Sequence, residues 1–230
     1  MISAAPPAHA SPACCYGASV RVGDLVDPWL YRHPFEGRSA HRYAAVERAG
    51  FGDLDERLID AWSPDLDAAR RVLDLGAGPA TFAQRLRARH PHLSVICAEP
   101  SRDFARPGET AAVVRARGEA LPFAAGAFDL ALCLSSIRHV ADRARTFAEL
   151  RRVVRGALWI VELDPEAGPA RRRNHTRPIR SRVLRWAFGP LVLATAPRAV
   201  DVAAVAGTAG WRVRDLRADP LQPVYVMRLE

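Results

Sequence analysis

The sequence predicts an α/β protein whose mostly parallel sheet carries helices on both faces. Between residues 70 and 163, five apolar runs alternate with segments of helical pattern. Near-continuous apolar strands separated by helices are typical of a parallel sheet that is buried on both sides. The last two runs, at 211–218 and 222–230, alternate polar and apolar residues and are joined by the short stretch "DPLQP". They indicate an antiparallel pair at one edge, which makes seven strands in all.

The chain of 230 residues has the length of one domain with additions. Residues 1–24 begin with a stretch rich in Ala, Pro and Ser, and they lack the charged start and long apolar centre of a signal peptide. We therefore expect a disordered tail. Residues 25–66 are expected to form an N-terminal helical cap segment, and residues 67–230 the main domain. Within it, residues 165–198 interrupt the alternation and are expected to form a lid insertion.

Two helices are expected in the cap segment. Ser39 can cap the first helix and Gly50 can end it. Asp53 and Glu56 have the spacing of a capping box for the second, and the stretch "SPD" at 63–65 is expected to break it. The second helix would carry one apolar face, formed by Leu54, Leu58 and Trp62.

The main domain then alternates strands and helices. The expected strands are RRVLDLG (70–76), LSVICAE (93–99), TAAVVRAR (110–117), FDLALCL (128–134), ALWIVEL (157–163), WRVRDLRA (211–218) and QPVYVMRLE (222–230). The expected helices cover residues 79–90, 101–107, 141–155 and 199–209. A loop, LPFAAGA, precedes the fourth strand.

The insertion holds most of the net charge. Residues 165–198 contain eight Arg and one acid, Glu166, whereas the whole chain has a net charge of +8 and no Lys. Such a stretch suits nucleic acid, an anionic lipid surface or an acidic substrate. However, Pro178 and Gly189 suit the two ends of a helix. That helix would place Ile179, Val183 and Trp186 on one apolar face and turn Arg180, Arg182 and Arg185 away from it. We therefore expect an amphipathic lid helix with a solvated back.

The loop after the first strand has the features of a cofactor site. Gly76 and Gly78 lie between a strand and a helix, where backbone must approach a ligand closely. Glu99 ends the next strand, where a parallel sheet would bring it beside this loop to bind a ribose diol. A dinucleotide motif would have a third glycine where this chain has Thr81, and it has no use for a carboxylate such as Asp74 before an anionic pyrophosphate. A cationic amine suits Asp74, so these residues favour S-adenosylmethionine (SAM) over NAD.

Several motifs in order resemble those of class I SAM-dependent methyltransferases, in the branch that acts on small molecules. "VLDLGAGPAT" resembles the first motif of that family and "VICAEPS" the second. They are followed by an E-x-L-P-F loop at the adenine side, an F-D-x-L strand and an E-x-x-R-V helix before the fifth strand. The resemblance implies a Rossmann-like seven-stranded sheet with SAM as cofactor.

The resemblance also implies site residues. The residues expected to bind the cofactor are Asp74, Gly76, Ala77, Gly78, Glu99, Pro100, Glu119, Ala120, Leu134 and Ser135. Two further residues are expected at the substrate, because they lie at the carboxyl edge where open α/β sheets bind ligands. His139 would act as a base and Glu162 would orient the acceptor, although each could also cap or pack locally. No metal is expected.

The function expected from these residues is methyl transfer from SAM to a small organic acceptor. The alternative is an RNA methyltransferase, or a non-catalytic protein that binds SAM or nucleic acid through the Arg-rich insertion. The stretch "LSSI" stands where nucleic-acid amino methyltransferases carry Asn/Asp-Pro-Pro-aromatic, which favours the small-molecule reading. Cys97 and Cys133 are expected to be reduced core residues. We expect a cytoplasmic protein with no membrane partner.

Overall fold

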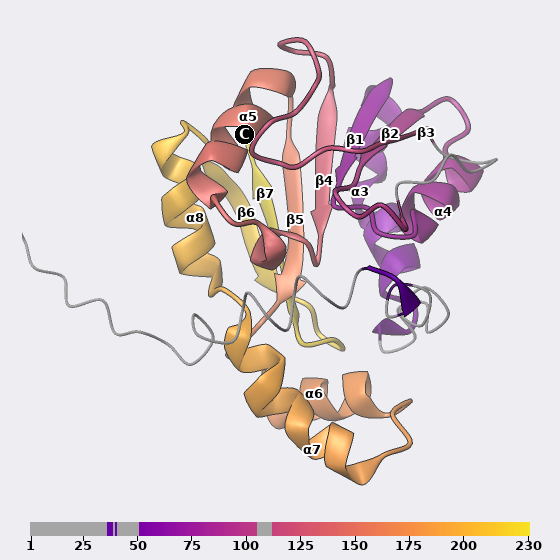
Figure 1. Cartoon of the computed structure of the whole chain (residues 1–230), viewed down its shortest axis with the longest axis vertical. Coiled ribbons are helices and arrows are strands. Elements are labelled where there is room, and N and C mark those ends of the chain that lie inside the picture. The colour runs from indigo at the N-terminus through magenta and orange to yellow at the C-terminus, as the bar shows by residue number, and fades with distance from the viewer. Residues whose placement is uncertain (1–35, 39, 41–50, 105–111) are drawn as a thin grey trace, which may run out of the picture.

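The sheet of this protein has seven strands in the order β3-β2-β1-β4-β5-β7-β6 (Figure 1). The computed structural model describes residues 36–38, 40, 51–104 and 112–230. Strands β1 to β5 run parallel, and β7 runs antiparallel to both β5 and β6. The bounds are β1 Arg71–Leu75, β2 Ser94–Ala98, β3 Ala112–Val114, β4 Leu130–Leu134, β5 Leu158–Leu163, β6 Val213–Ala218 and β7 Val224–Leu229. The predicted fold class, including the antiparallel edge, is confirmed.

Helices cover both faces of this sheet (Figure 1). The α-helices are α3 Leu54–Ala68, α4 Thr81–Arg89, α5 Arg143–Val153, α6 Pro169–Thr176, α7 Arg182–Leu191 and α8 Ala199–Thr208. Two short 3-10 helices, η2 Ile137–His139 and η3 Leu193–Thr195, complete the described elements. Residues 101–104 form a turn, where a helix was expected at 101–107. The predicted tail at 1–24 and the first predicted helix of the 25–66 segment lie outside the described residues, apart from positions 36–38 and 40.

Helix α3 is longer than expected. It continues through Pro64 to Ala68, so the predicted break at 63–65 is wrong. Tertiary packing explains the difference: Trp62 and Leu66 lie on either side of Pro64 and are both fully buried. The predicted capping box is also absent, because the Asp53 side chain makes no cap bond and accepts from Arg57 Nε at 3.0 Å.

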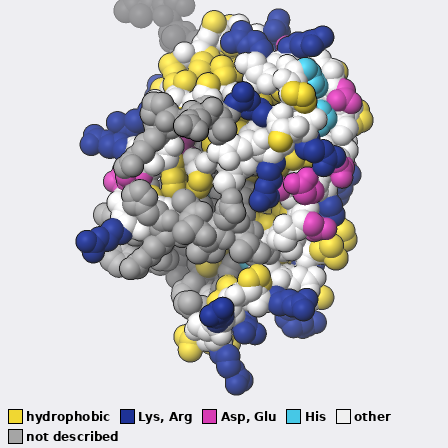
Figure 2. Space-filling model, turned by 90° about the vertical axis from the view of Figure 1, so that its right-hand side faces the viewer, with side chains coloured by type: hydrophobic (Ala, Val, Ile, Leu, Met, Phe, Trp, Pro, Cys, Tyr) yellow, Lys and Arg dark blue, Asp and Glu magenta, His cyan; other side chains and the backbone are white. Residues whose placement is uncertain are grey.

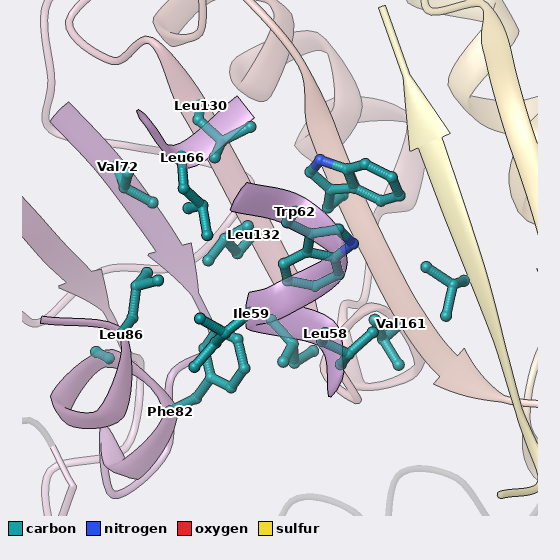
Figure 3. Packing of buried hydrophobic residues seen from close by; sticks show 14 of the residues in the cluster. Leu58, Ile59, Trp62, Leu66, Val72, Phe82, Leu86, Leu130, Leu132 and Val161 are labelled. Atoms are coloured by element: carbon teal, nitrogen blue, oxygen red, sulfur yellow. The ribbon is translucent and has the colours of Figure 1, made fainter. Parts of the chain in front are cut away.

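Helices α3 and α4 form the core on one face of the sheet (Figure 3). The Trp62 ring stacks on Trp159 of β5, with ring centres 5.1 Å apart, and meets the edge of Phe82 of α4 at 6.0 Å. Apolar residues of β1, β4 and β5, among them Val72, Leu132 and Val161, complete this cluster. The opposite face packs on α5 and α8, with Phe147 and Leu150 fully buried. Because helices cover both faces of the sheet, a ligand site is expected at the ends of the strands.

The insertion lies beyond the carboxyl ends of the parallel strands, where Figure 1 shows α6 and α7 below the sheet. Its second helix begins at Arg182, four residues after Pro178. The expected apolar face is not covered by the described residues, because Val183 is 72% exposed and Trp186 is 78% exposed, and Ile179 precedes the helix. The physical reason is the position of α7, whose main contacts are with α6 and η3.

Candidate active site at the switch point of the sheet

The loops after β1 and β4 meet at the carboxyl edge of the sheet. The strand order changes direction between these two neighbouring strands, and open α/β sheets bind ligands at that point. Ser136 follows β4, and its hydroxyl donates to the Leu75 carbonyl at 2.7 Å. A Cβ at Gly76 would lie 2.5 Å from the Ser136 Cβ, and Gly76 has φ +68°. Residue 76 must therefore be glycine for the two loops to meet.

Glu99 lies at the same edge, just after β2. One carboxylate oxygen accepts the Gly78 N–H at 2.8 Å and the other accepts the Ser101 N–H at 2.8 Å. Burial raises the pKa of Glu99, and these two N–H donors partly oppose the rise. The residue is 6% exposed. Glu99 and the glycine loop, 21 positions apart, thus lie in direct contact, which is the arrangement expected for binding a ribose.

Backbone conformation around this point is unusual. Gly78 has φ +55°, and a Cβ there would meet no atom of the described residues within 4 Å, so this side of the loop is open toward them. Two residues that are not glycine, Ala80 (φ 60°) and Ser135 (φ 54°), also adopt the left-handed region. Such strained residues gather at ligand sites. The Ser135 Oγ is buried and finds no hydrogen-bond partner among the described residues, so a ligand atom there would satisfy it.

The acid before the loop is buried in the sheet. Asp74 is 2% exposed and lies between Cys97 of β2 and Leu132 of β4. Its negative charge contributes to the raised pKa of the Cys97 thiol, which burial raises most. A second buried carboxylate beside the same loop as Glu99 favours a cationic ligand.

Three other residues that were expected to bind the cofactor differ in how far they are buried. Leu134 ends β4 and is buried, Ala77 is half-buried in the glycine loop, and Pro100 is exposed. Taken together, an open glycine loop, two buried carboxylates and an unsatisfied hydroxyl fit SAM, which carries a ribose and two cationic groups.

The expected adenine contacts are engaged within the protein. The Glu119 carboxylate accepts the backbone N–H groups of Ala141 and Asp142 at 3.0 and 3.2 Å, just before α5. Ala120 is exposed, and its N–H donates to the Arg117 carbonyl at 3.1 Å. Glu119 thus ties the loop before β4 to the start of α5, and its role toward adenine stays a prediction.

The two expected substrate residues lie near the end of β4 and β5. His139 ends the 3-10 helix η2 and is half-buried. Burial, with the nearby charges of Arg138 and Arg143, lowers the pKa of His139 to about 3. Glu162 is fully buried and accepts the N–H groups of Leu163 and Arg138 at 2.8 and 3.2 Å. Burial raises its pKa, and the Arg138 charge opposes the rise. Both roles stay predictions.

Sequence reasoning missed two serines that shape this edge. Ser136 joins the two loops, as described above, and its hydroxyl lies 3.0 Å from the Cys133 sulfur. Ser101 donates its N–H to Glu99, and its hydroxyl accepts the Asp103 N–H at 3.2 Å. The serines in the stretches "LSSI" and "EPS", which directly follow two strands, were the only sequence feature that could have indicated these contacts. Burial raises the pKa of Cys133 to about 12, so it stays a thiol.

Two features at the opposite edge of the sheet are not part of this site. A surface hollow there is lined by charged residues that pair with one another, such as Arg228 with Asp65 and Arg155 with Asp129. The second is a cluster of Asp67, His90 and His92, whose possible ligand atoms lie within 4.8 Å of one another. Its members make local bonds: His90 Nδ1 lies 3.2 Å from Asp67 Oδ1, and His92 Nε2 lies 3.2 Å from the Leu66 carbonyl.

The strand order, the antiparallel last pair and the glycine loop beside Glu99 form the arrangement expected of a class I SAM-dependent methyltransferase. Comparison with known proteins agrees. Residues 73–160 match the family model described as "Methyltransferase domain". Residues 73–160 of this chain thus carry a methyltransferase domain.

Individual relatives cover part of the chain. A malonyl-[acyl-carrier protein] O-methyltransferase of Geobacter sulfurreducens is 33% identical over 139 residues, which are 56% of this chain and 51% of that protein. A glycine/sarcosine/dimethylglycine N-methyltransferase of Actinopolyspora halophila is 28% identical over 67% of this chain and 29% of that protein. The chain spans about half the length, or less, of these curated relatives.

Solved structures share the fold. A putative O-methyltransferase from Nostoc punctiforme has a TM-score of 0.61 and 14% identity, covering 86% of this chain and 60% of that one. A SAM-dependent methyltransferase from Aquifex aeolicus has a TM-score of 0.54 and 13% identity, covering 70% and 81%. Among the described residues, no helix is long and apolar enough to cross a membrane.

Proposed function

We propose that the chain transfers a methyl group from SAM to a small organic acceptor. The observation that carries this proposal is the contact between Glu99 and the Gly78 N–H at the point where the strand order reverses. It brings the acid that we expect to bind the ribose beside the glycine loop. The match of residues 73–160 to the methyltransferase family model supports the same activity.

The residues of the carboxyl edge have distinct roles in this proposal. When bound, SAM supplies a methyl group that its sulfonium already activates. The chain's residues therefore need only bind, orient and exclude water. Glu99 would hold the ribose hydroxyls, Gly76 and Gly78 would let the backbone approach the methionine part, and Asp74 would favour its ammonium. Leu134 and Ser135 would lie beside the reacting group.

The acceptor would bind above η2, between the ends of β4 and β5. Glu162 acts there as a positioning residue, because its carboxylate holds the Arg138 N–H and with it the turn that carries His139. His139 is neutral at neutral pH, so it would accept a hydrogen bond and orient the acceptor. The insertion at 165–198 would form the wall or lid over this side.

The relatives' names support a small acceptor, and they include both O- and N-methyltransferases. The proposal covers oxygen, nitrogen and carbon acceptors alike. We place the reaction in the cytoplasm, a reducing compartment, because Cys97 and Cys133 are buried free thiols. The cysteines at 14 and 15 lie outside the described residues.

RNA is the second candidate, since the insertion carries eight arginines. Labelled SAM incubated with the protein and either a host metabolite extract or host RNA separates the two. Label in the metabolite pool supports the proposal, and label in RNA overturns the choice of acceptor.

Calorimetry tests the cofactor. We expect SAM to bind with micromolar affinity, and tighter binding of NADH than of SAM would refute the assignment of the cofactor.

A further inference from the structure

The most exposed large apolar side chains of the described residues lie together on α7. Val183 is 72% exposed and Trp186, three positions later, is 78% exposed. Residues three apart share one face of a helix. A tryptophan held in water on a helix that begins at Arg182 is an unfavourable arrangement unless another surface covers it.

The same segment is strongly basic. No Asp or Glu occurs between Glu166 and Asp201, and eight arginines do. Arg171 pairs with Asp164 and Arg198 with Asp201. Five exposed arginines of the segment form no ion pair with any residue that the structure describes: Arg173, Arg177, Arg180, Arg182 and Arg185. Figure 2 shows basic and hydrophobic side chains together at the lower end of the molecule, where Figure 1 places α6 and α7.

We propose that α7 and the turn before it seat on an anionic lipid bilayer. A helix with exposed Trp and aliphatic residues beside unpaired arginines is the pattern of helices that lie in the membrane interface. The ring of Trp186 would enter the boundary between headgroups and acyl chains, and the arginines would contact the phosphates. Phosphates of a nucleic acid would leave Val183 in water, so the apolar face favours lipid.

The position of α7 in the fold allows a lipid bilayer to reach it. It projects from the carboxyl edge of the sheet and makes its main contacts with α6 and η3, so a flat surface can reach it without disturbing the core. Helix α6 is the fixed part of the insertion, because Asn174 Nδ2 donates to the Leu221 carbonyl at 3.1 Å and the His175 ring packs on Phe51 at 4.6 Å. The surface would lie on the side where the acceptor of the proposed reaction enters.

Sedimentation of the full chain with vesicles tests the proposal. We expect wild-type protein to bind phosphatidylcholine vesicles that contain one quarter phosphatidylglycerol, and to bind pure phosphatidylcholine at least tenfold less. Trp186→Ala should weaken binding to the anionic vesicles at least tenfold, because most of a large aromatic surface is lost from the interface. Arg180→Glu/Arg182→Glu should weaken it by more than tenfold, since each arginine near such a surface contributes about a fivefold gain.

Matched controls keep the result specific. Leu216→Ala removes an apolar residue of β6 that is 42% exposed, and Arg87→Glu/Arg212→Glu makes the same change in net charge on other surfaces. Both should bind vesicles like the wild type. Equal binding to the two vesicle types, or no effect of Trp186→Ala, would overturn the proposal. So would a wild-type dimer that Trp186→Ala dissociates while vesicles are not bound. The assay contains neither SAM nor acceptor, so its outcome is independent of the proposed reaction.

Discussion

At the scale of single residues, Glu99 is the side chain on which cofactor binding should depend most. Replacing it with Gln keeps the size and removes the negative charge that a ribose diol would bind. We expect Glu99→Gln to weaken SAM binding by about 1.5–3 kcal/mol, the range for lost charge-assisted hydrogen bonds. Calorimetry measures this, with Glu56→Gln, an exposed acid on α3, as the control. Wild-type affinity in Glu99→Gln would remove the ribose assignment.

The contact of Glu99 with Gly78 could be expected from sequence, because both follow parallel strands and so reach one edge. The contact of Gly76 with Ser136 could not. It depends on β4 lying beside β1, and a serine after a strand carries no signal of the carbonyl it will bind. The acids of a site can thus be found from their places in the chain. The small residues that fit its loops together need the tertiary structure.

The pKa of His139 makes a prediction about pH. Its folded value of about 3 is below the ordinary value of 6.5, so the unfolded chain binds the extra proton first as pH falls. Stability from this group is present above about pH 6.5 and is lost on acidification toward pH 3. Between pH 6.5 and 4.5 the wild type should lose about 1–2 kcal/mol more stability than His139→Asn, allowing for its partial exposure.

Urea unfolding of both proteins at the two pH values measures this difference, since other titrating groups are shared and cancel. A second readout is activity. Because the imidazole is neutral throughout this window, methyl transfer should show no inflection near pH 6.5 that His139→Asn abolishes. Such an inflection would mean that the residue titrates in the ordinary range and is available as a base.

At the scale of elements, the glycine loop offers a matched pair of substitutions. Gly76 and Gly78 both have positive φ, but a Cβ at Gly76 meets Ser136, whereas a Cβ at Gly78 meets no described residue within 4 Å. Gly78→Ala should lower the free energy of unfolding by about 1 kcal/mol through backbone strain. Gly76→Ala should lower it by about 3 kcal/mol, because the overlap adds to the strain.

Urea unfolding tests the pair, and Gly76→Ala/Ser136→Gly provides the control. Removing the serine side chain relieves the overlap, so the double variant should recover part of the loss seen in Gly76→Ala. Equal losses in the two single variants would contradict a special contact at Gly76. The comparison separates the cost of a left-handed backbone from the cost of joining the two loops.

The helices and strands are predicted well where the spacing of hydrophobic residues determines them. They are predicted poorly where the prediction rests on a helix-breaking residue such as proline. The strands and α4, α5 and α8 fall close to their expected places. Helix α3 does not stop at Pro64, because its last turn is held by the burial of Leu66 and by the hydrogen bonds that Asp65 accepts from Trp159 and Arg228. Proline lowers the probability of a helix locally, but it cannot report on the packing that outweighs it.

At the scale of the whole molecule, the insertion should respond to ligands bound at the carboxyl edge. It follows β5 and lies beyond the ends of the parallel strands (Figure 1). We expect residues 165–198 to exchange amide hydrogens more slowly when SAM and an acceptor are both present, because the segment would then cover the site. Mass spectrometry of the exchanged protein measures this, with the β6–β7 hairpin as the internal control. Unchanged exchange in 165–198 would place the acceptor elsewhere.

The position of the insertion could be predicted from topology, but the direction of its apolar face could not. The pattern of Ile179, Val183 and Trp186 describes a helix with one apolar side, and it fits equally a side packed on the protein and a side turned outward. Only the three-dimensional arrangement decides between them. The exposed Trp186 changes the expected partner of the insertion from the protein's own core to an outside surface.

The arginines of the insertion separate the three partners considered for it. If they serve a lipid surface, Arg180→Glu/Arg182→Glu should leave methyl transfer to a water-soluble acceptor within about twofold of wild type, because solvated charges contribute little to a distant site. If the acceptor is RNA, each lost phosphate contact should instead flatten the slope of log affinity against log salt by about 0.7–0.9.

A salt titration of RNA binding, made beside the turnover assay, distinguishes these outcomes. We expect weak RNA binding that salt abolishes and that has no relation to turnover. An RNA dissociation constant near 10 nM at physiological salt, the range of specific nucleic-acid binders, would assign the insertion to nucleic acid. A large loss of turnover on the soluble acceptor would instead make the arginines part of the substrate site. Unchanged turnover together with lost vesicle binding would separate a lipid-binding insertion from the methyl-transfer site.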